Sequence, residues 1–337
     1  MDIALLAHDQ FPERAKTAVG VLRYGDDTVR AVLDRSHAGD RVRDHVPNVQ
    51  NAQIVANMDE APPVDALVIG IAPIGGGFDD SWRPDVRTAL ERGCDVIAGL
   101  HTFLTDDEEF SALADEHDCA LRDLRQSPGD LTVAEGAAGG VDAEVVLTVG
   151  TDCSSGKMTA SYELRDAARE RGIDAAVVPT GQTGVLIEGW GIVVDRVIAD
   201  FAAGAVERLV ETAAKEHDLL IVEGQGALGH PAYSGVTTSL LHGARPDRLV
   251  LCHVAGRTAV NGYESTPLPS PPDYADLYER VTRPVSPAPV VAGMLNTRSL
   301  AGEAAADAVA AYADDLNCPA TDPVRFDIDG DLLEAVV

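Results

Sequence analysis

A segment that starts at Gly150, with the sequence GTDCSSGKMT, has the residue types of a phosphate-binding loop. Gly150 and Gly156 bracket it, an apolar run (144–149) precedes it and a helical pattern (157–171) follows it. Backbone N–H groups in such a loop attract an anion, as does the N-terminus of the next helix, and Lys157 adds a positive charge. The spacing therefore predicts a strand, a loop and a helix that hold a phosphate group.

This loop departs from the usual GxxxxGK[ST] pattern in two ways. Five residues rather than four separate the glycines, and Met158 occupies the position of the Ser or Thr that binds Mg²⁺. Thr159 comes one residue later, a rotation of about 100° around the helix. We therefore expect a phosphate site in which bound Mg²⁺ is not favoured. The candidate cofactor-binding residues are Gly150, Thr151, Asp152, Cys153, Ser154, Ser155, Gly156, Lys157, Met158 and Thr159.

A second polar segment comes at the end of the apolar run 175–179 and has the sequence TGQTG. It offers two hydroxyl groups, an amide and two glycines, and ligands of open α/β sheets bind at the carboxyl ends of the strands. An ordinary turn is the alternative interpretation. The candidate substrate-binding residues here are Thr180, Gly181, Gln182, Thr183 and Gly184.

Glu223 and His230 belong to a third segment, EGQGALGH, in which Glu223 ends the apolar run 219–223. A carboxylate at the tip of a strand beside a phosphate loop can hold Mg²⁺ or a water molecule. A histidine can act as a base near neutral pH. With Lys157 these two are the candidate catalytic residues, and Glu223 is the metal ligand if Mg²⁺ is used. A capping or surface carboxylate and a structural loop histidine are the alternatives.

Three later residues complete the set of candidates. Asn296 follows the run 290–295, where its amide can pair with the edge of an adenine, although an Asn turn is the alternative. Arg257 and Arg298 can bind the carboxylates of an acidic substrate.

The N-terminal part of the chain alternates apolar runs with helical patterns. Apolar runs of strand length occupy 3–7, 29–34, 65–73 and 94–100. This alternation predicts a parallel, Rossmann-like α/β sheet. A glycine run at 75–77 lacks the GxGxxG spacing, so a plain turn is favoured there.

Periodicity stops between 126 and 143, and a second α/β series begins at 144. We place a boundary near 138, which gives a Rossmann-like domain at 1–137 and a P-loop NTPase-like domain with a parallel sheet at 138–337. The strands of this second domain are predicted to be covered on both faces, because their apolar runs are continuous rather than alternating.

Composition restricts the partners and the compartment. The chain of 337 residues has a net charge of −29, which disfavours nucleic acid and anionic membranes as partners. It contains three lysines against 23 arginines, and such an acidic, lysine-poor chain resembles proteins from organisms with a salt-rich cytosol. Five scattered cysteines, no signal-peptide pattern and no apolar run of membrane-spanning length predict a cytoplasmic protein. We expect a small-molecule substrate and a homo-oligomer.

The segments GTDCSSGK, PTGQTG and VEGQG, followed by Asn296, together resemble the dethiobiotin synthetase branch of P-loop proteins. That resemblance covers about the second half of the chain. It implies that Lys157 and the loop amides hold phosphates, that Glu223 lies near a metal ion and that Asn296 faces adenine.

A closer resemblance covers nearly the whole chain and rests on longer motifs. GTDCSSGKMT, PTGQTG, GWGIVVD, IADF, VEGQGALGHPAYSGVT and LLHGARPD are similar to the DgcN family, as are IGIAPIGGG and AGLHTFL in the N-terminal part. The family was long catalogued as a domain of unknown function. The resemblance implies a Rossmann-like domain followed by a P-loop-like domain, and N-acetylation of D-glutamate from acetyl-CoA.

Three functions are compatible with these residues. The favoured one is an N-acetyltransferase whose loop holds the diphosphate of acetyl-CoA, with His230 or Glu223 as the base and Gln182, Thr183 or loop amides as oxyanion donors. The second is an ATP- and Mg²⁺-dependent ligase that activates a carboxylate, as the synthetase resemblance suggests. The third is a regulatory protein that binds a nucleotide without chemistry.

The charge of the chain makes its stability depend on salt. At about 1 M salt the Debye length is roughly 3 Å, so the repulsion between surface carboxylates is screened. We expect the melting temperature to rise as KCl is raised from low to molar concentration, as measured by differential scanning fluorimetry. A melting temperature independent of KCl would contradict an adaptation to high salt.

Overall fold

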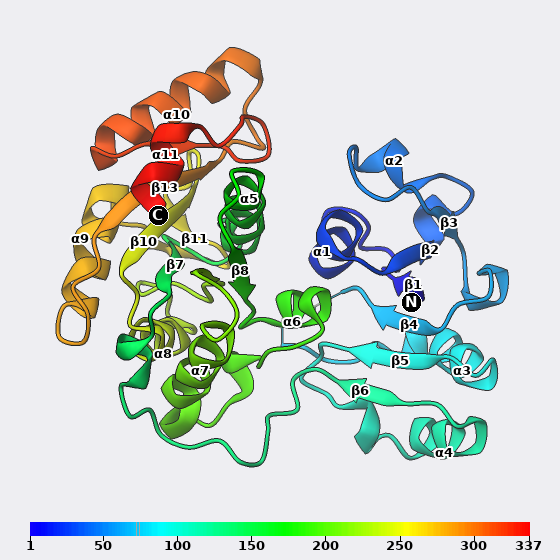
Figure 1. Cartoon of the computed structure of the whole chain (residues 1–337). Helices are drawn as coiled ribbons and strands as arrows, with labels where there is room; N and C mark the ends of the chain where they lie inside the picture. Colours follow the sequence, from blue (N-terminus) through cyan, green and yellow to red (C-terminus); the bar gives the residue numbers. More distant parts are fainter. Residues whose placement is uncertain (72, 74) are drawn as a thin grey trace. The chain divides into compact units, whose positions relative to one another are not determined.

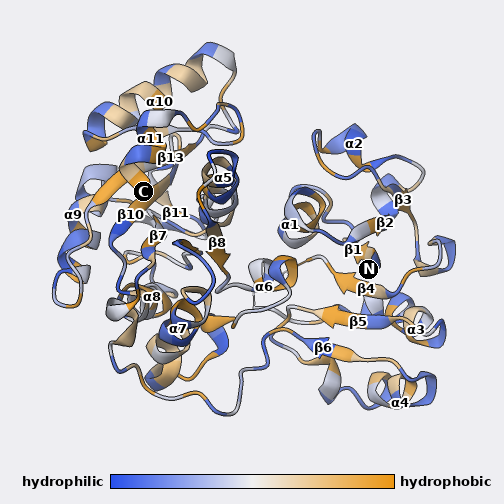
Figure 2. Ribbon diagram, viewed as in Figure 1, coloured by the Kyte–Doolittle hydropathy of each residue, from blue (hydrophilic) through white to orange (hydrophobic). Residues whose placement is uncertain are grey.

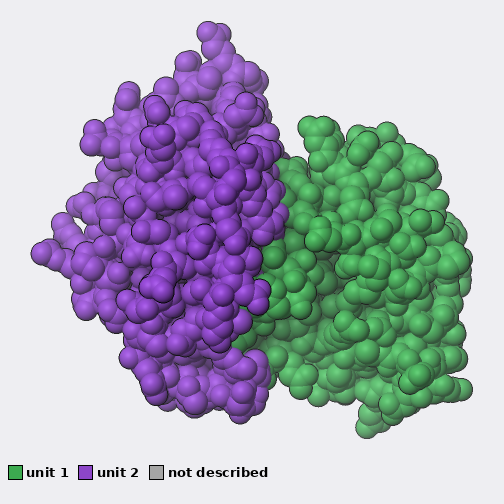
Figure 3. Space-filling model, in the orientation of Figure 1, with its two compact units in different colours: residues 1–127, 185–196 green, residues 128–184, 197–337 purple. Residues whose placement is uncertain are grey.

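The computed structural model describes residues 1–337 except 72 and 74, which belong to the predicted run 65–73 and to the motif IGIAPIGGG. The chain forms two compact units (Figure 3). The N-terminal unit comprises 1–127 and 185–196, and the C-terminal unit comprises 128–184 and 197–337. The boundary predicted near 138 therefore differs from the division at 127, and a segment of later sequence joins the first unit.

The N-terminal unit contains a six-stranded parallel sheet in the order β3-β2-β1-β4-β5-β6 (Figure 1). The strand order reverses at β1, which has β2 on one side and β4 on the other, as in Rossmann-like folds. The strands are β1 (Asp2–Leu6), β2 (Thr28–Leu33), β3 (Gln53–Val55), β4 (Ala66–Ile69), β5 (Asp95–Ala98) and β6 (Leu121–Asp123). The helices are α1 (Lys16–Tyr24), α2 (Val42–His45), α3 (Arg83–Glu91) and α4 (Glu108–His117).

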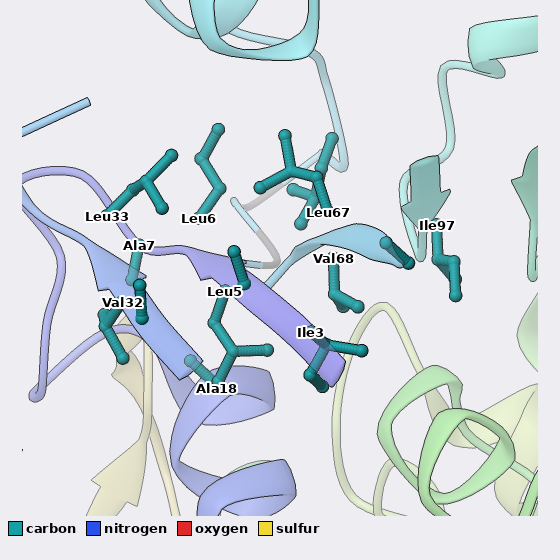
Figure 4. Close-up of a cluster of buried hydrophobic side chains, with 14 of the residues drawn as sticks. Ile3, Leu5, Leu6, Ala7, Ala18, Val32, Leu33, Leu67, Val68 and Ile97 are labelled. Atoms are coloured by element: carbon teal, nitrogen blue, oxygen red, sulfur yellow. The ribbon is translucent and has the colours of Figure 1, made fainter. Parts of the chain in front are cut away.

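The core of this unit is aliphatic and centres on β1 (Figure 4). Leu5 and Leu6 of β1 are fully buried, as are Val32 of β2, Leu67 of β4 and Ala18 of α1. The central strands β4 and β5 are mostly hydrophobic (Figure 2), because helices cover both faces of the sheet. The continuous apolar runs in the sequence are thus explained by burial on both sides.

The C-terminal unit contains a second six-stranded parallel sheet, in the order β14-β13-β10-β7-β9-β8. Its strands are β7 (Glu144–Gly150), β8 (Ala175–Val178), β9 (Leu219–Val222), β10 (Arg248–Val254), β13 (Val290–Asn296) and β14 (Ala320–Thr321). Its helices are α5 (Lys157–Glu170), α7 (Ala199–Ala213), α8 (Ser234–Ala244), α9 (Pro271–Thr282), α10 (Gly302–Leu316) and α11 (Gly330–Val336). A hairpin of β11 (Ala259–Val260) and β12 (Tyr263–Pro267) follows β10, and α6 (Gln182–Glu188) crosses the division between the units.

β7 lies between β9 and β10, so the loop that follows β7 is flanked by the carboxyl ends of two other strands. This arrangement confirms the predicted parallel α/β sheet and sets the phosphate-loop segment at its ligand-binding edge. None of the helices that the structure describes is long and apolar enough to cross a membrane.

Close backbone packing beside β7 requires a glycine at position 224. A Cβ atom at Gly224 would lie 1.7 Å from the backbone oxygen of Thr148, and the Gly224 amide donates to Thr148 Oγ1 at 3.0 Å. The contact partner is backbone of a central strand and cannot rotate away. The turn after β9 can therefore approach β7 only without a side chain at this position.

We expect Gly224→Ala to lower the free energy of unfolding by about 3 kcal/mol or more, because strand backbone must move. Gly235→Ala is the matched control: a Cβ there meets open space in α8, and alanine favours a helix by up to about 1 kcal/mol. Chemical denaturation measures both. Equal stability of the two variants would contradict the close approach at Gly224.

Candidate functional site

The loop between β7 and α5 is shaped by left-handed backbone and by a glycine at its start. Ser154 has φ 51° and Gly156 has φ 103°. A Cβ atom at Gly150 would lie 2.4 Å from Ser155 Oγ and 2.9 Å from Lys157 Nζ. The two glycines that bracket the motif therefore allow the tight turn and the folding of the loop around its lysine.

Lys157 is the cation of this loop. Its side chain is buried, and Nζ donates to the backbone oxygen of Asp152 at 2.9 Å and to Ser155 Oγ at 3.4 Å. It is the first residue of α5, so its charge adds to the partial positive charge at the helix N-terminus. Met158 is also buried and supplies no oxygen ligand. These groups fit a phosphate better than a phosphate with its metal ion.

The carboxylate of Asp152 accepts hydrogen bonds from three donors. It is fully buried; Oδ1 accepts from the Cys153 amide at 2.7 Å, and Oδ2 accepts from Arg257 at 2.9 Å and from the Asn261 amide at 2.8 Å. Arg257 also donates to the backbone oxygen of Cys153 at 2.9 Å. The guanidinium predicted to bind a substrate is thus engaged with the loop itself.

Glu223 and the predicted substrate segment meet at the ends of β8 and β9. Glu223 is buried, and its Oε2 accepts from the Gly181 amide at 3.2 Å. Thr180 Oγ1 donates to the backbone oxygen of Glu223 and accepts from Gln225 Nε2 at 3.3 Å. A Cβ atom at Gly184 would lie 2.4 Å from Glu223 Oε2. Glu223, the candidate base, is therefore linked to the TGQTG segment by hydrogen bonds and close packing.

His230 lies near the phosphate loop. One ligand atom each from Asp152, Cys153 and His230 lie within 4.8 Å of one another. Since both carboxylate oxygens of Asp152 already accept hydrogen bonds and Arg257 is beside it, this group does not favour a metal cation.

The ring of His230 has a defined neutral tautomer. Nδ1 accepts from the Ala232 amide at 3.1 Å, so the neutral ring carries its proton on Nε2. The rings of Tyr233 and Tyr263 contact it at centroid distances of 4.7 and 5.2 Å. Burial lowers the pKa of His230; Lys157 lowers it further and Asp152 opposes the shift. His230 is therefore a neutral N–H donor at pH 7.

Two residues at the loop were not singled out from the sequence. His253, near the end of β10, has Nδ1 2.8 Å from Thr151 Oγ1, and its ring stacks on Tyr312 at 5.9 Å. Tyr278 of α9 donates its hydroxyl to the backbone oxygen of Gly150 at 2.7 Å. The available signal for His253 was a histidine at the tip of the apolar run RLVLCHV, and the signal for Tyr278 was its place in the Pro-rich segment 256–289, which is typical of a lid or a wrapping arm.

Asn296 and Arg298 have no hydrogen bond or ion pair to the loop among the contacts that the structure describes. Asn296 ends β13, which is separated from β7 by β10, and its Oδ1 accepts from the Arg298 amide at 3.1 Å. This hydrogen bond is that of an Asn turn, the alternative considered for Asn296. Arg298 is exposed.

Comparison with known proteins identifies the family. A model described as a domain of unknown function (DUF1611_C), P-loop domain, matches residues 132–333. A second model (DUF1611_N), a Rossmann-like domain, matches residues 35–127. The chain belongs to the DUF1611 family. The crystal structure of a DUF1611 family protein from Anabaena variabilis is 40% identical, has a TM-score of 0.94 and covers 99% of this chain and 98% of its own.

Two curated relatives of this chain carry the name D-glutamate N-acetyltransferase. The protein from Pseudoalteromonas sp. is 38% identical over 78% of this chain and 79% of its own length. The protein from Tritonibacter scottomollicae is 34% identical over 92% of this chain and 91% of its own length. The Rossmann-like and P-loop domains predicted from the sequence, and the family resemblance, are thereby confirmed.

His253 should make the stability depend on pH. Burial, with Arg257 nearby, lowers its pKa to about 4, whereas Asp152 opposes the shift. The unfolded chain, with a histidine pKa of about 6.5, binds the proton first as pH falls, so folded stability is lost between about pH 6.5 and 4. We expect His253→Gln to remove about 2 kcal/mol of the stability lost between pH 7 and pH 5, measured by denaturation in high salt. Parallel pH profiles of wild type and variant would contradict this assignment.

Proposed function

We propose that this chain transfers the acetyl group of acetyl-CoA to the amino group of an acidic amino acid, D-glutamate. The observation that carries the proposal is the match of most of the chain to two relatives named D-glutamate N-acetyltransferase. The phosphate loop supports it, because acetyl-CoA carries a diphosphate and an additional phosphate. Buried Met158 supports it as well, since thioester aminolysis requires no ATP hydrolysis and no metal ion.

In this proposal Lys157 and the loop amides hold the diphosphate of acetyl-CoA. The geometry fits because Lys157 lies within the loop and at the N-terminus of α5. Asn296 is the proposed contact for the adenine, and Arg298 remains a proposed contact for the substrate. Arg257 acts on the loop through Asp152 rather than on the substrate.

Aminolysis of the thioester requires a base, an oxyanion donor and close approach of the amine. One ammonium proton passes to the base and the amine nitrogen forms the N–C bond. As the C–S bond breaks, the second proton lost from nitrogen goes to sulfur, so that CoA leaves as the thiol. His230 carries its proton on Nε2, so we assign it as a donor to the developing oxyanion and assign Glu223 as the base. Gln182 and Thr183 remain further candidate oxyanion donors.

One observation favours a second candidate, an ATP-dependent ligase. Glu223 is a buried carboxylate after β9, the strand beside β7, where it is suited to hold Mg²⁺. The residue after Lys157 is a buried methionine rather than a Ser or Thr that could bind Mg²⁺, which argues against a ligase. A nucleotide-binding regulatory protein without catalysis is the third outcome of the test.

A homo-oligomer, a cytoplasmic location, a salt-rich cytosol and the lack of nucleic-acid or membrane partners remain part of the proposal.

A thiol-release assay in molar KCl distinguishes the three. Purified protein is incubated with acetyl-CoA and D-glutamate, and free CoA and N-acetyl-D-glutamate are measured. We expect equal amounts of both products without ATP or Mg²⁺. Product formation only with ATP and Mg²⁺ would favour the ligase, and acetyl-CoA or nucleotide binding without turnover would favour the regulatory protein.

Lys157→Ala tests the role of the loop in the same assay. A charge-assisted hydrogen bond contributes about 1.5–3 kcal/mol, so KM for acetyl-CoA should rise at least about tenfold. Lys215→Ala is the control, because Lys215 is exposed and is one of only two other lysines. An unchanged KM in the Lys157 variant would remove the loop from the acetyl-CoA site.

A further inference from the structure

The N-terminal unit has a pocket of its own, with a volume of about 210 Å³. Asp9, Gln10, Glu13 and Arg14, from the loop after β1, line it together with Ser36 and His37 from the turn after β2. It therefore lies at the carboxyl ends of β1 and β2, on the edge of the sheet at which open α/β sheets bind ligands. Pockets for drug-sized ligands span about 300–1,000 Å³, so this one suits a smaller molecule.

One wall of the pocket is fixed by hydrogen bonds. Asp34, which directly follows β2 and is fully buried, accepts from the Asp9 amide at 2.6 Å and from His37 Nδ1 at 2.5 Å. Ser36 Oγ donates to Asp9 Oδ1 at 2.8 Å. Asp9 has φ 57°, a left-handed conformation that a non-glycine residue adopts only when its surroundings hold it. The Asp9 carboxylate is thus held in a set place.

Three other residues of the pocket lining have no side-chain partner in the described part of the chain. Among the residues that the structure describes, Gln10, Glu13 and Arg14 make no ion pair and no side-chain hydrogen bond, and Glu13 and Arg14 are exposed. The pocket therefore offers one carboxylate, Glu13, and one guanidinium, Arg14, that have no partner in the described chain, whereas Asp9 accepts from Ser36 and lies 3.8 Å from Arg35. A ligand that satisfies both must carry both signs of charge.

A buried histidine adds an acceptor at the same strand end. His8, the residue before Asp9, donates from Nε2 to Asp85 Oδ2 at 2.9 Å, and the other oxygen of Asp85 accepts from the Met58 amide at 2.6 Å. In its neutral form His8 accepts at Nδ1, which has no hydrogen-bond partner within the described residues. His8 is not among the residues that line the pocket, so this atom belongs to the same strand end without being a contact of the pocket.

A dinucleotide does not fit this edge of the sheet. The loop after β1 reads AHDQFPER and lacks the glycines that let a diphosphate approach the backbone. Asp34 occupies the place of the carboxylate that binds a ribose in Rossmann folds, but it is buried and already accepts two hydrogen bonds.

We propose that this pocket binds a free α-amino acid as its zwitterion. The ammonium group is held by the carboxylates of Asp9 and Glu13, and the α-carboxylate by Arg14. The pocket volume suits a molecule of this size, and the lining carries side chains of both signs of charge. The choice of D-glutamate as the first probe rests on the proposed function, whereas the pocket assignment rests on its charges.

Isothermal titration calorimetry on the full chain in molar KCl tests the pocket, without acetyl-CoA. We expect D-glutamate and D-alanine to bind and glutarate, which has no ammonium group, not to bind. Glu13→Gln and Arg14→Gln should each weaken D-glutamate binding at least about tenfold. Glu116→Gln and Arg23→Gln are matched controls on the same unit and should bind as wild type. The melting temperature of each variant shows that it is folded.

Two results would overturn the proposal: glutarate binding as well as D-glutamate, or unchanged D-glutamate binding in both pocket variants. The acetyl-transfer assay separates this failure from failure of the proposed function. Acetylation of D-glutamate with wild-type binding in the Glu13 and Arg14 variants would refute the pocket alone. Loss of amino-acid binding in those variants, in a chain without acetyl transfer, would support the pocket and refute the proposed function.

Discussion

The shape of the phosphate loop depends on one buried carboxylate, that of Asp152. A carboxylate without solvent is tolerated only where donors surround it. Its donors are the neighbouring amide of Cys153 and two groups from the segment after β10, Arg257 and the Asn261 amide. If the loop and that segment moved independently, the Asp152 carboxylate would become exposed to solvent or lose its hydrogen-bond donors. Together with the Tyr278 hydroxyl on Gly150, this makes the loop conformation a property of the tertiary structure.

This dependence explains which parts of the site could be predicted from the sequence. The strand, loop and helix around Lys157 are adjacent in the chain, and the local pattern of glycines, a lysine and apolar runs predicts them. Asp152 and Arg257 are 105 residues apart, and Thr151 and His253 are 102 apart. A chain with 23 arginines gives no local sign of which one pairs with a buried aspartate. Arg257 was therefore assigned to a substrate, while the structure shows it beside the loop.

In the N-terminal unit, too, the sequence predicts local elements better than it predicts contacts between distant residues. Apolar runs identified β1, β2, β4 and β5 because burial on both faces leaves a continuous pattern, whereas the three-residue strands β3 and β6 were not predicted. The pocket beside β1 has no such pattern, since its polar residues resemble those of any exposed loop. Only the adjacency of β1 and β2 brings Asp9 against Asp34 and Ser36, and adjacency in a parallel sheet is decided by the whole topology. The glycines at 75–77, which attracted attention in the sequence, are not among the residues that line the pocket.

The chemistry of the C-terminal site is restricted by what two of its residues lack. Met158 has no oxygen, so the loop lacks the hydroxyl that fixes Mg²⁺ in phosphoryl-transfer enzymes. His230 has no free lone pair in its neutral form, because Nδ1 accepts from Ala232 and Nε2 carries the proton. Proton uptake at Nε2 would require a proton on Nδ1, facing the Ala232 N–H group, and burial further opposes a charged ring. A histidine in this state donates a hydrogen bond throughout the reaction, which suits the stabilisation of a developing oxyanion and leaves proton transfer to a carboxylate.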